Sequence, residues 1–214
     1  MAPLVKICGL KTPDTLAAAL EAGADMVGFV FFPKSPRHID LATAETLGQQ
    51  ADGRALKVAL TVDADDATLA AIIAALHPDL LQLHGHETPE RVAAIRARFG
   101  LPVMKAIGVA KADDLKDVAA FAAVADRLLF DAKPPKDAAH PGGNGLAFDW
   151  SLITGLDLSI PSMVSGGLDP ANVAEALRRT GASGVDVSSG VETAPGQKDP
   201  AKITAFVTAA KGKD

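Results

Sequence analysis

The sequence predicts a single-domain α/β protein, an eight-stranded (β/α)8 TIM barrel spanning residues 1–214. Three observations predict this fold. Eight short apolar runs recur about every 26 residues, the length of one strand-and-helix unit. Segments with helical periodicity separate these runs. The composition, 48% hydrophobic but only 4% aromatic, suits helices packed on a parallel sheet.

Side chains typical of helix N-caps precede four of the helical segments, and glycine follows three. Three of these caps, Thr12, Thr88 and Asp169, are followed by proline, which fits the first position of a helix. The expected N-caps are Thr12, Asp65, Thr88 and Asp169, and the C-terminal glycines are Gly23, Gly100 and Gly181. The expected strands are residues 4–7, 26–31, 56–62, 80–83, 103–107, 127–130, 162–164 and 184–187.

Strict alternation of strands and helices implies a parallel sheet with right-handed crossovers. An open, doubly wound sheet is the alternative. That fold would be expected to carry a glycine fingerprint after the first strand. The segment Cys8-Gly9-Leu10-Lys11-Thr12 contains none, so a closed barrel is favoured.

Composition and charge exclude several classes of function. The net charge of −5 and the lack of a basic stripe argue against a nucleic-acid partner. A single cysteine suits a reducing compartment, and no secretory leader or apolar run near 20 residues is visible. We therefore expect a cytoplasmic protein with no membrane contact. The outer helix faces show no large apolar patch, so a monomer is expected. No plausible metal cluster occurs.

Serine and glycine follow the last two expected strands. Gly166 and Gly167 come after the seventh strand, and Ser188, Ser189 and Gly190 come after the eighth. A strand could end in such residues as a plain turn. Two such loops in succession, with free backbone N–H groups, are typical of the phosphate site of a (β/α)8 barrel.

Cys8 lies at the C-terminal end of the first strand, where catalytic side chains of such barrels are found. A lone cysteine is usually a small buried hydrophobe. Its position, and the nearby Lys6 and Lys11, favour a thiolate that acts as a base.

Asp131 follows the sixth strand and precedes a long loop rich in proline and glycine. The carboxylate could be a helix cap or a surface group. However, Pro134 and Pro135 prevent an immediate helix, and long loops inside compact domains are usually functional. We therefore expect Asp131 to act as a general acid beneath a lid that includes Gly142, Gly143, Asn144 and Gly145.

Three further side chains lie at strand ends or in the loops after them. Arg37 could be a surface charge, but Pro33 and Pro36 restrict its loop, and a held guanidinium suits a carboxylate. His84 follows the fourth strand and could equally be structural. Asp186 lies within the eighth strand.

Seven motifs in order resemble the phosphoribosylanthranilate isomerase family of tryptophan biosynthesis, across nearly the whole chain. Each motif alone is weak, and the set in register is specific. The motifs are Lys-Ile-Cys-Gly at 6–9, Gly-Phe-Val-Phe at 28–31 with Ser-Pro-Arg at 35–37, Leu-Gln-Leu-His-Gly at 81–85, Phe-Asp at 130–131, Phe-Asp-Trp at 148–150, Ser-Gly-Gly-Leu at 165–168 and Asp-Val-Ser-Ser-Gly-Val-Glu at 186–192.

The resemblance implies an Amadori rearrangement of N-(5-phosphoribosyl)anthranilate to the aminoketose, with no cofactor. It implies that Asp131 is the acid that opens the furanose ring and that Cys8 is the base that removes the C2′ proton. Arg37 would hold the anthranilate carboxylate, while His84 and Asp186 would line the pocket. Family members often have Gly-Gly-Thr-Gly in the lid, and Asn144 at that position is expected to alter loop kinetics.

Two other functions remain open from the residues alone. The related aminoaldose isomerase of histidine biosynthesis uses two carboxylates and grips a phosphate at each end of its substrate. Here Cys8 ends the first strand, and Ser-Gly-Gly occurs once. A non-catalytic phosphate-binding barrel is the second alternative, and it would have no need of Cys8 and Asp131.

Overall fold

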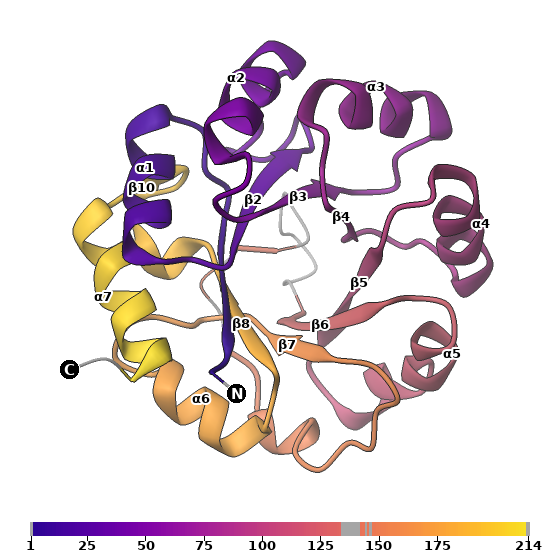
Figure 1. The fold of residues 1–214 in the computed structure, drawn as a ribbon. Helices are drawn as coiled ribbons and strands as arrows, with labels where there is room; N and C mark the ends of the chain where they lie inside the picture. The colour runs from indigo at the N-terminus through magenta and orange to yellow at the C-terminus, as the bar shows by residue number, and fades with distance from the viewer. Residues whose placement is uncertain (1, 134–141, 144, 146, 213–214) are drawn as a thin grey trace.

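In the computed structural model, eight parallel strands form a closed barrel in chain order, from β1 to β8. The structure describes residues 2–133, 142–143, 145 and 147–212. Closure comes from β1, which pairs with β2 on one side and with β8 on the other. Figure 1 looks down this barrel. The strands are β1 (Leu4–Cys8), β2 (Met26–Phe31), β3 (Leu56–Thr61), β4 (Leu80–Leu83), β5 (Val103–Val109), β6 (Arg127–Ala132), β7 (Ser162–Val164) and β8 (Gly184–Val187).

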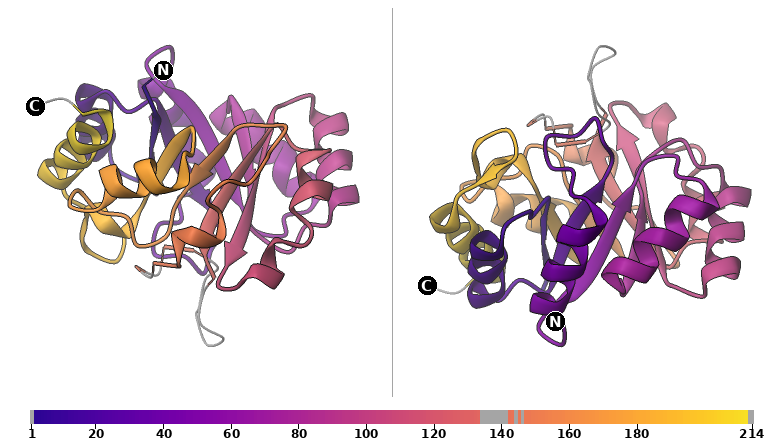
Figure 2. Two further views of the ribbon diagram at one scale, coloured as in Figure 1. Left: turned by 90° about the horizontal axis from the view of Figure 1, so that it is seen from below. Right: turned by 90° about the horizontal axis from the view of Figure 1, so that it is seen from above.

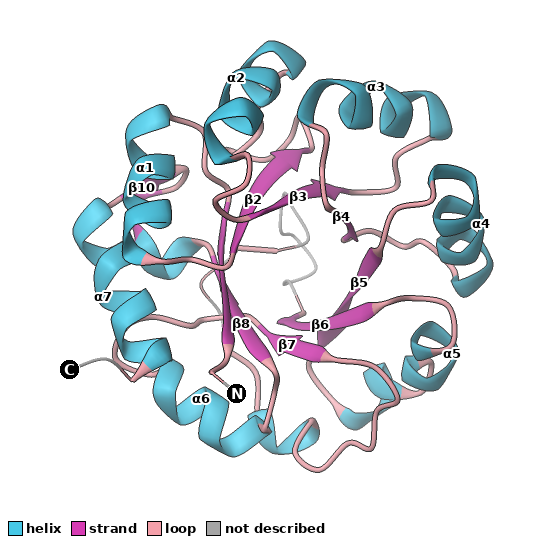
Figure 3. Cartoon of the chain, viewed as in Figure 1, coloured by secondary structure: helices cyan, strands magenta, loops and turns pink. Residues whose placement is uncertain are grey.

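Helices surround the barrel on its outside, as Figures 2 and 3 show. A short antiparallel hairpin of β9 and β10 follows β8. Between β6 and β7, the described element is the 3-10 turn η2. The α-helices are α1 (Pro13–Ala22), α2 (Leu41–Ala51), α3 (Asp66–Leu76), α4 (Pro89–Phe99), α5 (Val118–Ala122), α6 (Val173–Thr180) and α7 (Pro200–Lys211); the 3-10 turns are η1 (Ala112–Leu115), η2 (Trp150–Leu152) and η3 (Ser189–Val191); the hairpin strands are β9 (Glu192–Ala194) and β10 (Gln197–Lys198).

The N-caps predicted at Thr12, Asp65 and Thr88 are confirmed, because each side chain accepts a hydrogen bond from the first turn of its helix. The prediction for Asp169 is wrong. Its carboxylate accepts from the backbone N–H groups of Ala171 and Asn172, which holds a turn, and α6 begins only at Val173. The three predicted C-terminal glycines all have left-handed backbone angles.

The two faces of each barrel strand have different surroundings, as the side-chain alternation of a strand requires. In β1, Val5 and Ile7 pack into the main core, which includes residues of the surrounding helices. Cys8 packs instead with Val30 and Leu60 in a separate cluster. A further cluster fills the barrel interior away from the end at which Cys8 lies. It consists of Met26, Val58, Leu80, Met104, Ala106, Leu129 and Met163. The barrel is therefore a packed core with polar residues at one end.

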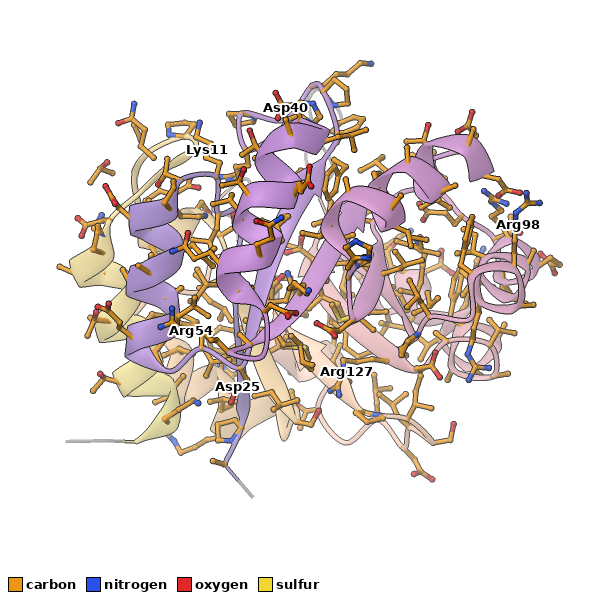
Figure 4. The ribbon with its side chains drawn as sticks, turned by 45° about the horizontal axis from the view of Figure 1, so that its top comes forward. Lys11, Asp25, Asp40, Arg54, Arg98 and Arg127 are labelled. Atoms are coloured by element: carbon orange, nitrogen blue, oxygen red, sulfur yellow. The ribbon has the colours of Figure 1, made fainter. Side chains whose placement is uncertain are left out.

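The two ends of the barrel carry different charged groups. Figure 4 shows Lys11 and Asp40 at the end where strands finish, and Asp25 and Arg127 at the end where they begin. The Asp25 carboxylate accepts from the backbone N–H of Val5, 2.8 Å away, and so ties the start of β2 to β1.

None of the described helices is long and apolar enough to cross a bilayer.

Candidate active site

A cavity open to solvent lies where the barrel strands end. Its position is that of active sites in (β/α)8 barrels. Of the predicted site residues, it is lined by Cys8, Arg37, His84, Asp131, Gly142, Gly143, Gly145, Gly166, Gly167, Asp186, Ser188 and Ser189.

Among the described residues, one predicted site residue, Gly190, does not line this cavity. Gly190 packs against the backbone carbonyl of Leu168, where a Cβ would not fit, so it shapes the loop from behind. Asn144 lies outside the described residues. Asp131 is also placed slightly differently from the prediction, because β6 runs on to Ala132 and includes it. Its side chain is therefore held by the sheet rather than by a loop.

The Cys8 thiol is buried next to a buried ion pair. Lys6 Nζ donates to Asp186 Oδ1 at 3.0 Å, and the Lys6 side chain is fully buried. Burial raises the pKa of Cys8, while the positive charge of Lys6 beside it works in the opposite direction. Burial also opposes the charge on Lys6, but its pKa is raised because Asp186 and Cys8 stabilise the ammonium. The site thus holds a cation against the thiol.

Asp131 in β6 lies beside His84, which follows β4, with only β5 between the two strands. The Asp131 Oδ2 atom lies 3.2 Å from His84 Nε2, and Asp131 Oδ1 accepts from the Ala132 backbone N–H at 2.9 Å. Gln82 Nε2 lies 3.0 Å from His84 Nδ1. With the amide nitrogen as donor, Nδ1 accepts and Nε2 carries the proton toward Asp131. Gln82 and His84 share one face of the chain because they are two residues apart.

Arg37 is already paired within the protein, which sequence reasoning did not predict. Its Nε and Nη2 donate to Glu192 Oε1 and Oε2, both at 2.8 Å. Nη2 also donates to the carbonyl oxygen of Gly143 at 3.2 Å. Lys198 Nζ donates to the same Glu192 carboxylate at 2.7 Å. Glu192 ends the last motif of the resemblance, which was the signal available in the sequence.

The predicted phosphate loops meet at one side of the cavity. Gly166 and Gly167 have φ values of 84° and 63°, which favour glycine and turn the chain sharply after β7. In the described part of the chain, the backbone N–H groups of Gly166, Gly167 and Ser189 donate to no other protein group. Ser188 Oγ donates to the carbonyl oxygen of Cys8 at 3.1 Å, which ties this loop to β1.

The model of the "N-(5'phosphoribosyl)anthranilate (PRA) isomerase" family matches residues 5–209. The chain belongs to this family. A protein of this activity from Rhodopseudomonas palustris strain HaA2 is 64% identical over 214 residues, covering 100% of this chain and 98% of the relative. One from Nitrobacter winogradskyi is 64% identical over 214 residues, covering 100% of this chain and 95% of the relative. The isomerase family thus accounts for the whole length of the chain.

Solved isomerases share the fold. Phosphoribosyl anthranilate isomerase from Thermotoga maritima superposes with a TM-score of 0.88 at 35% identity, covering 99% of this chain and 100% of that one. Another, with a TM-score of 0.84 at 32% identity and the same coverage, was solved with reduced 1-(o-carboxyphenylamino)-1-deoxyribulose 5-phosphate. The chain is therefore an isomerase of tryptophan biosynthesis that rearranges N-(5'-phosphoribosyl)anthranilate.

Proposed function

We propose that Asp131 and Cys8 are the acid and the base of this rearrangement. The observation that carries the proposal is that β1 and β6, on different sides of the barrel, present these two groups to one cavity. The reaction opens a sugar ring and then moves a proton from carbon. It therefore needs one proton donor and one acceptor on the same substrate.

Asp131 gives its proton to the furanose ring oxygen. The bond from this oxygen to C1′ then breaks, and the amino nitrogen supplies an electron pair to form a protonated Schiff base. His84, 3.2 Å from the Asp131 carboxylate, holds the side chain in place. The carboxylate that remains after proton transfer can accept a hydrogen bond from the same imidazole.

Cys8 then removes the C2′ proton as a thiolate. The electrons of the C–H bond form the C1′–C2′ double bond. The electrons of the former C=N bond return to the nitrogen of the protonated Schiff base and neutralise it, which gives an enolamine. Tautomerisation of the enol at C2′ yields the ketone. Lys6 supports this step because its charge favours the thiolate over the thiol.

The remaining residues bind the two ends of the substrate. The Gly166, Gly167 and Ser189 amides, with Ser188 and Gly190 shaping their loop, would hold the phosphate. Arg37 would hold the anthranilate carboxylate. Asp186 lines the cavity and pairs with Lys6. The predicted lid glycines lie around the cavity, Gly142 beside Asp131 and His84, Gly143 beside Arg37 and Gly145 nearest Ser189. Binding at both ends fixes the reacting carbons between acid and base.

The test is the pair Cys8→Ser and Asp131→Asn, each assayed by the fluorescence change as the anthranilate ribotide is consumed. Each variant should lose at least about 100-fold in kcat yet bind the reduced product analogue, because only proton transfer is removed. Asp63→Asn is the matched control: this aspartate also follows a barrel strand but lies outside the cavity. Near-full turnover by either variant would refute its assigned role.

We also propose that residues 1–214 act as one domain, as a monomer in the cytoplasm. The large hydrophobic side chains exposed in the described chain, Leu41 and Leu56, are 42% and 46% exposed, which gives little apolar surface for a stable dimer. Size-exclusion chromatography with light scattering tests the monomer, and a dimer mass would refute it. Cell fractionation tests the location.

A further inference from the structure

We propose that Glu192 and Lys198 form a positioning pair that fixes the two binding ends of the cavity, Glu192 through Arg37 and Lys198 through Ser188. The two residues face each other across the β9–β10 hairpin. The inference rests on the role proposed above for Arg37, and it adds two residues that do not line the cavity.

The Glu192 carboxylate selects which edge of the Arg37 guanidinium faces the substrate. It occupies the edge formed by Nε and Nη2, with both oxygen atoms at 2.8 Å. The edge formed by Nη1 and Nη2 borders Gly143 at the cavity, and its Nη2 also donates to the Gly143 carbonyl oxygen at 3.2 Å. A planar fork held on its other side can receive a second carboxylate on this edge with little loss of side-chain entropy, and that carboxylate would replace the Gly143 carbonyl as the acceptor from Nη2.

The Lys198 ammonium connects the same carboxylate to the phosphate loop. Its Nζ donates to Glu192 Oε1 at 2.7 Å, to the Ser188 carbonyl oxygen at 2.9 Å and to Ser188 Oγ at 3.1 Å. Ser188 in turn donates to the Cys8 carbonyl oxygen at 3.1 Å. One buried lysine therefore holds the loop in register with β1.

These three charged side chains are buried, so the contacts between them are energetically important. The side chains of Arg37, Glu192 and Lys198 are 5%, 4% and 1% exposed. Unpaired charges at such depth are costly, so each of the three depends on the others. Burial opposes ionisation of Glu192, but hydrogen bonds from Arg37 and the charge of Lys198 lower its pKa below the ordinary value. Two cations and one anion leave the cluster positive, which favours an anionic ligand.

The experiment compares Glu192→Gln, Lys198→Met and Arg37→Met. Affinity for the reduced product analogue, which carries both carboxylate and phosphate, is measured beside inhibition by inorganic phosphate. Glu192→Gln should weaken analogue binding at least about 10-fold and leave phosphate inhibition within about twofold, because only the carboxylate end loses its support. Lys198→Met should weaken phosphate inhibition.

A double-mutant cycle separates positioning from direct contact. In an Arg37→Met background, Glu192→Gln should change analogue affinity by less than about threefold, because its effect passes through Arg37. Lys202→Met is the control: Lys202 donates to the backbone carbonyl of Glu192, not to its carboxylate, and its loss should leave both affinities unchanged. Two results would overturn the inference. One is that Glu192→Gln weakens analogue binding as much in the Arg37→Met background as in the parent protein. The other is that Glu192→Gln weakens phosphate inhibition as much as it weakens analogue binding.

Two further outcomes are distinguishable. If Arg37→Met binds the analogue like the parent protein, the proposed role of Arg37 fails instead. If Glu192→Gln does not fold, NMR of the parent protein still tests whether Glu192 holds Arg37. The Arg37 Nε–H signal should exchange slowly with solvent and persist when the analogue binds, since Glu192 keeps its edge. Its loss on binding would overturn the inference.

Discussion

Replacing Gly166 with alanine should cost far more than its unusual backbone angle alone explains. Gly166 has a φ of 84°, and a Cβ there would lie 2.6 Å from the Ala132 backbone nitrogen and 3.1 Å from Asp131 Oδ1. Gly23, after α1, provides the matched control. Its φ is 85°, and nothing lies within 4 Å of a Cβ. Both substitutions place alanine at a left-handed backbone angle. Only Gly166→Ala also brings the new Cβ into collision with neighbouring atoms.

The magnitudes follow from these two terms. A left-handed alanine costs about 1–2 kcal/mol, so Gly23→Ala should lower Tm by roughly 2–8 °C. The added collision costs about 1–3 kcal/mol more, so Gly166→Ala should lower Tm by roughly 4–20 °C. Displacing Asp131 should also reduce kcat/KM about 100-fold. Gly23→Ala should keep its kcat/KM within about twofold, because it is distant from the cavity.

The assay is thermal unfolding followed by circular dichroism, with kcat/KM measured on the same samples. Equal Tm losses for the two variants would refute the collision argument, since the backbone term would then account for both. Full activity of Gly166→Ala would refute the placement of this loop against Asp131.

Two other predictions concern the buried charges. Lys105→Met leaves Glu87, its partner at 2.7 Å, buried without a cation, and should lower the free energy of unfolding by about 3–5 kcal/mol. Lys57→Met, whose carboxylate partner is exposed, should cost less than about 1 kcal/mol in the same denaturant titrations, and equal losses would contradict this reasoning. Because burial raises the pKa of Cys8 and the base proposed above is its thiolate, kcat/KM should rise with pH through neutrality. Lys6→Met removes the opposing charge and should move this rise to higher pH, so a flat profile would argue against a thiolate base.

Much of the fold could be predicted because its determinants are local. The apolar runs marked all eight strands, since each strand of a parallel barrel is buried on both faces. Thr12 and Thr88 marked helix starts because a side-chain cap acts within one turn. Asp169 was misleading, because the same carboxylate geometry also holds a turn.

Most candidate site residues could also be predicted from the sequence, since a barrel gathers the C-terminal ends of its strands. Cys8, His84 and Asp131 needed only that rule. Glu192 and Lys198 did not follow from it. They lie in a hairpin after the last strand, where neither period nor position marks a role.

The sequence by itself determined the strands, most of the helix starts, the family and the set of polar groups at one end of the barrel. Only the tertiary structure decided how those groups pair. Lys6 meets Asp186 across 180 residues, and Arg37 meets Glu192 across 155. Such contacts depend on the register with which β1 closes against β8. Local patterns specify which face of a strand is buried, whereas a distance across the barrel exists only once the ring of strands is closed.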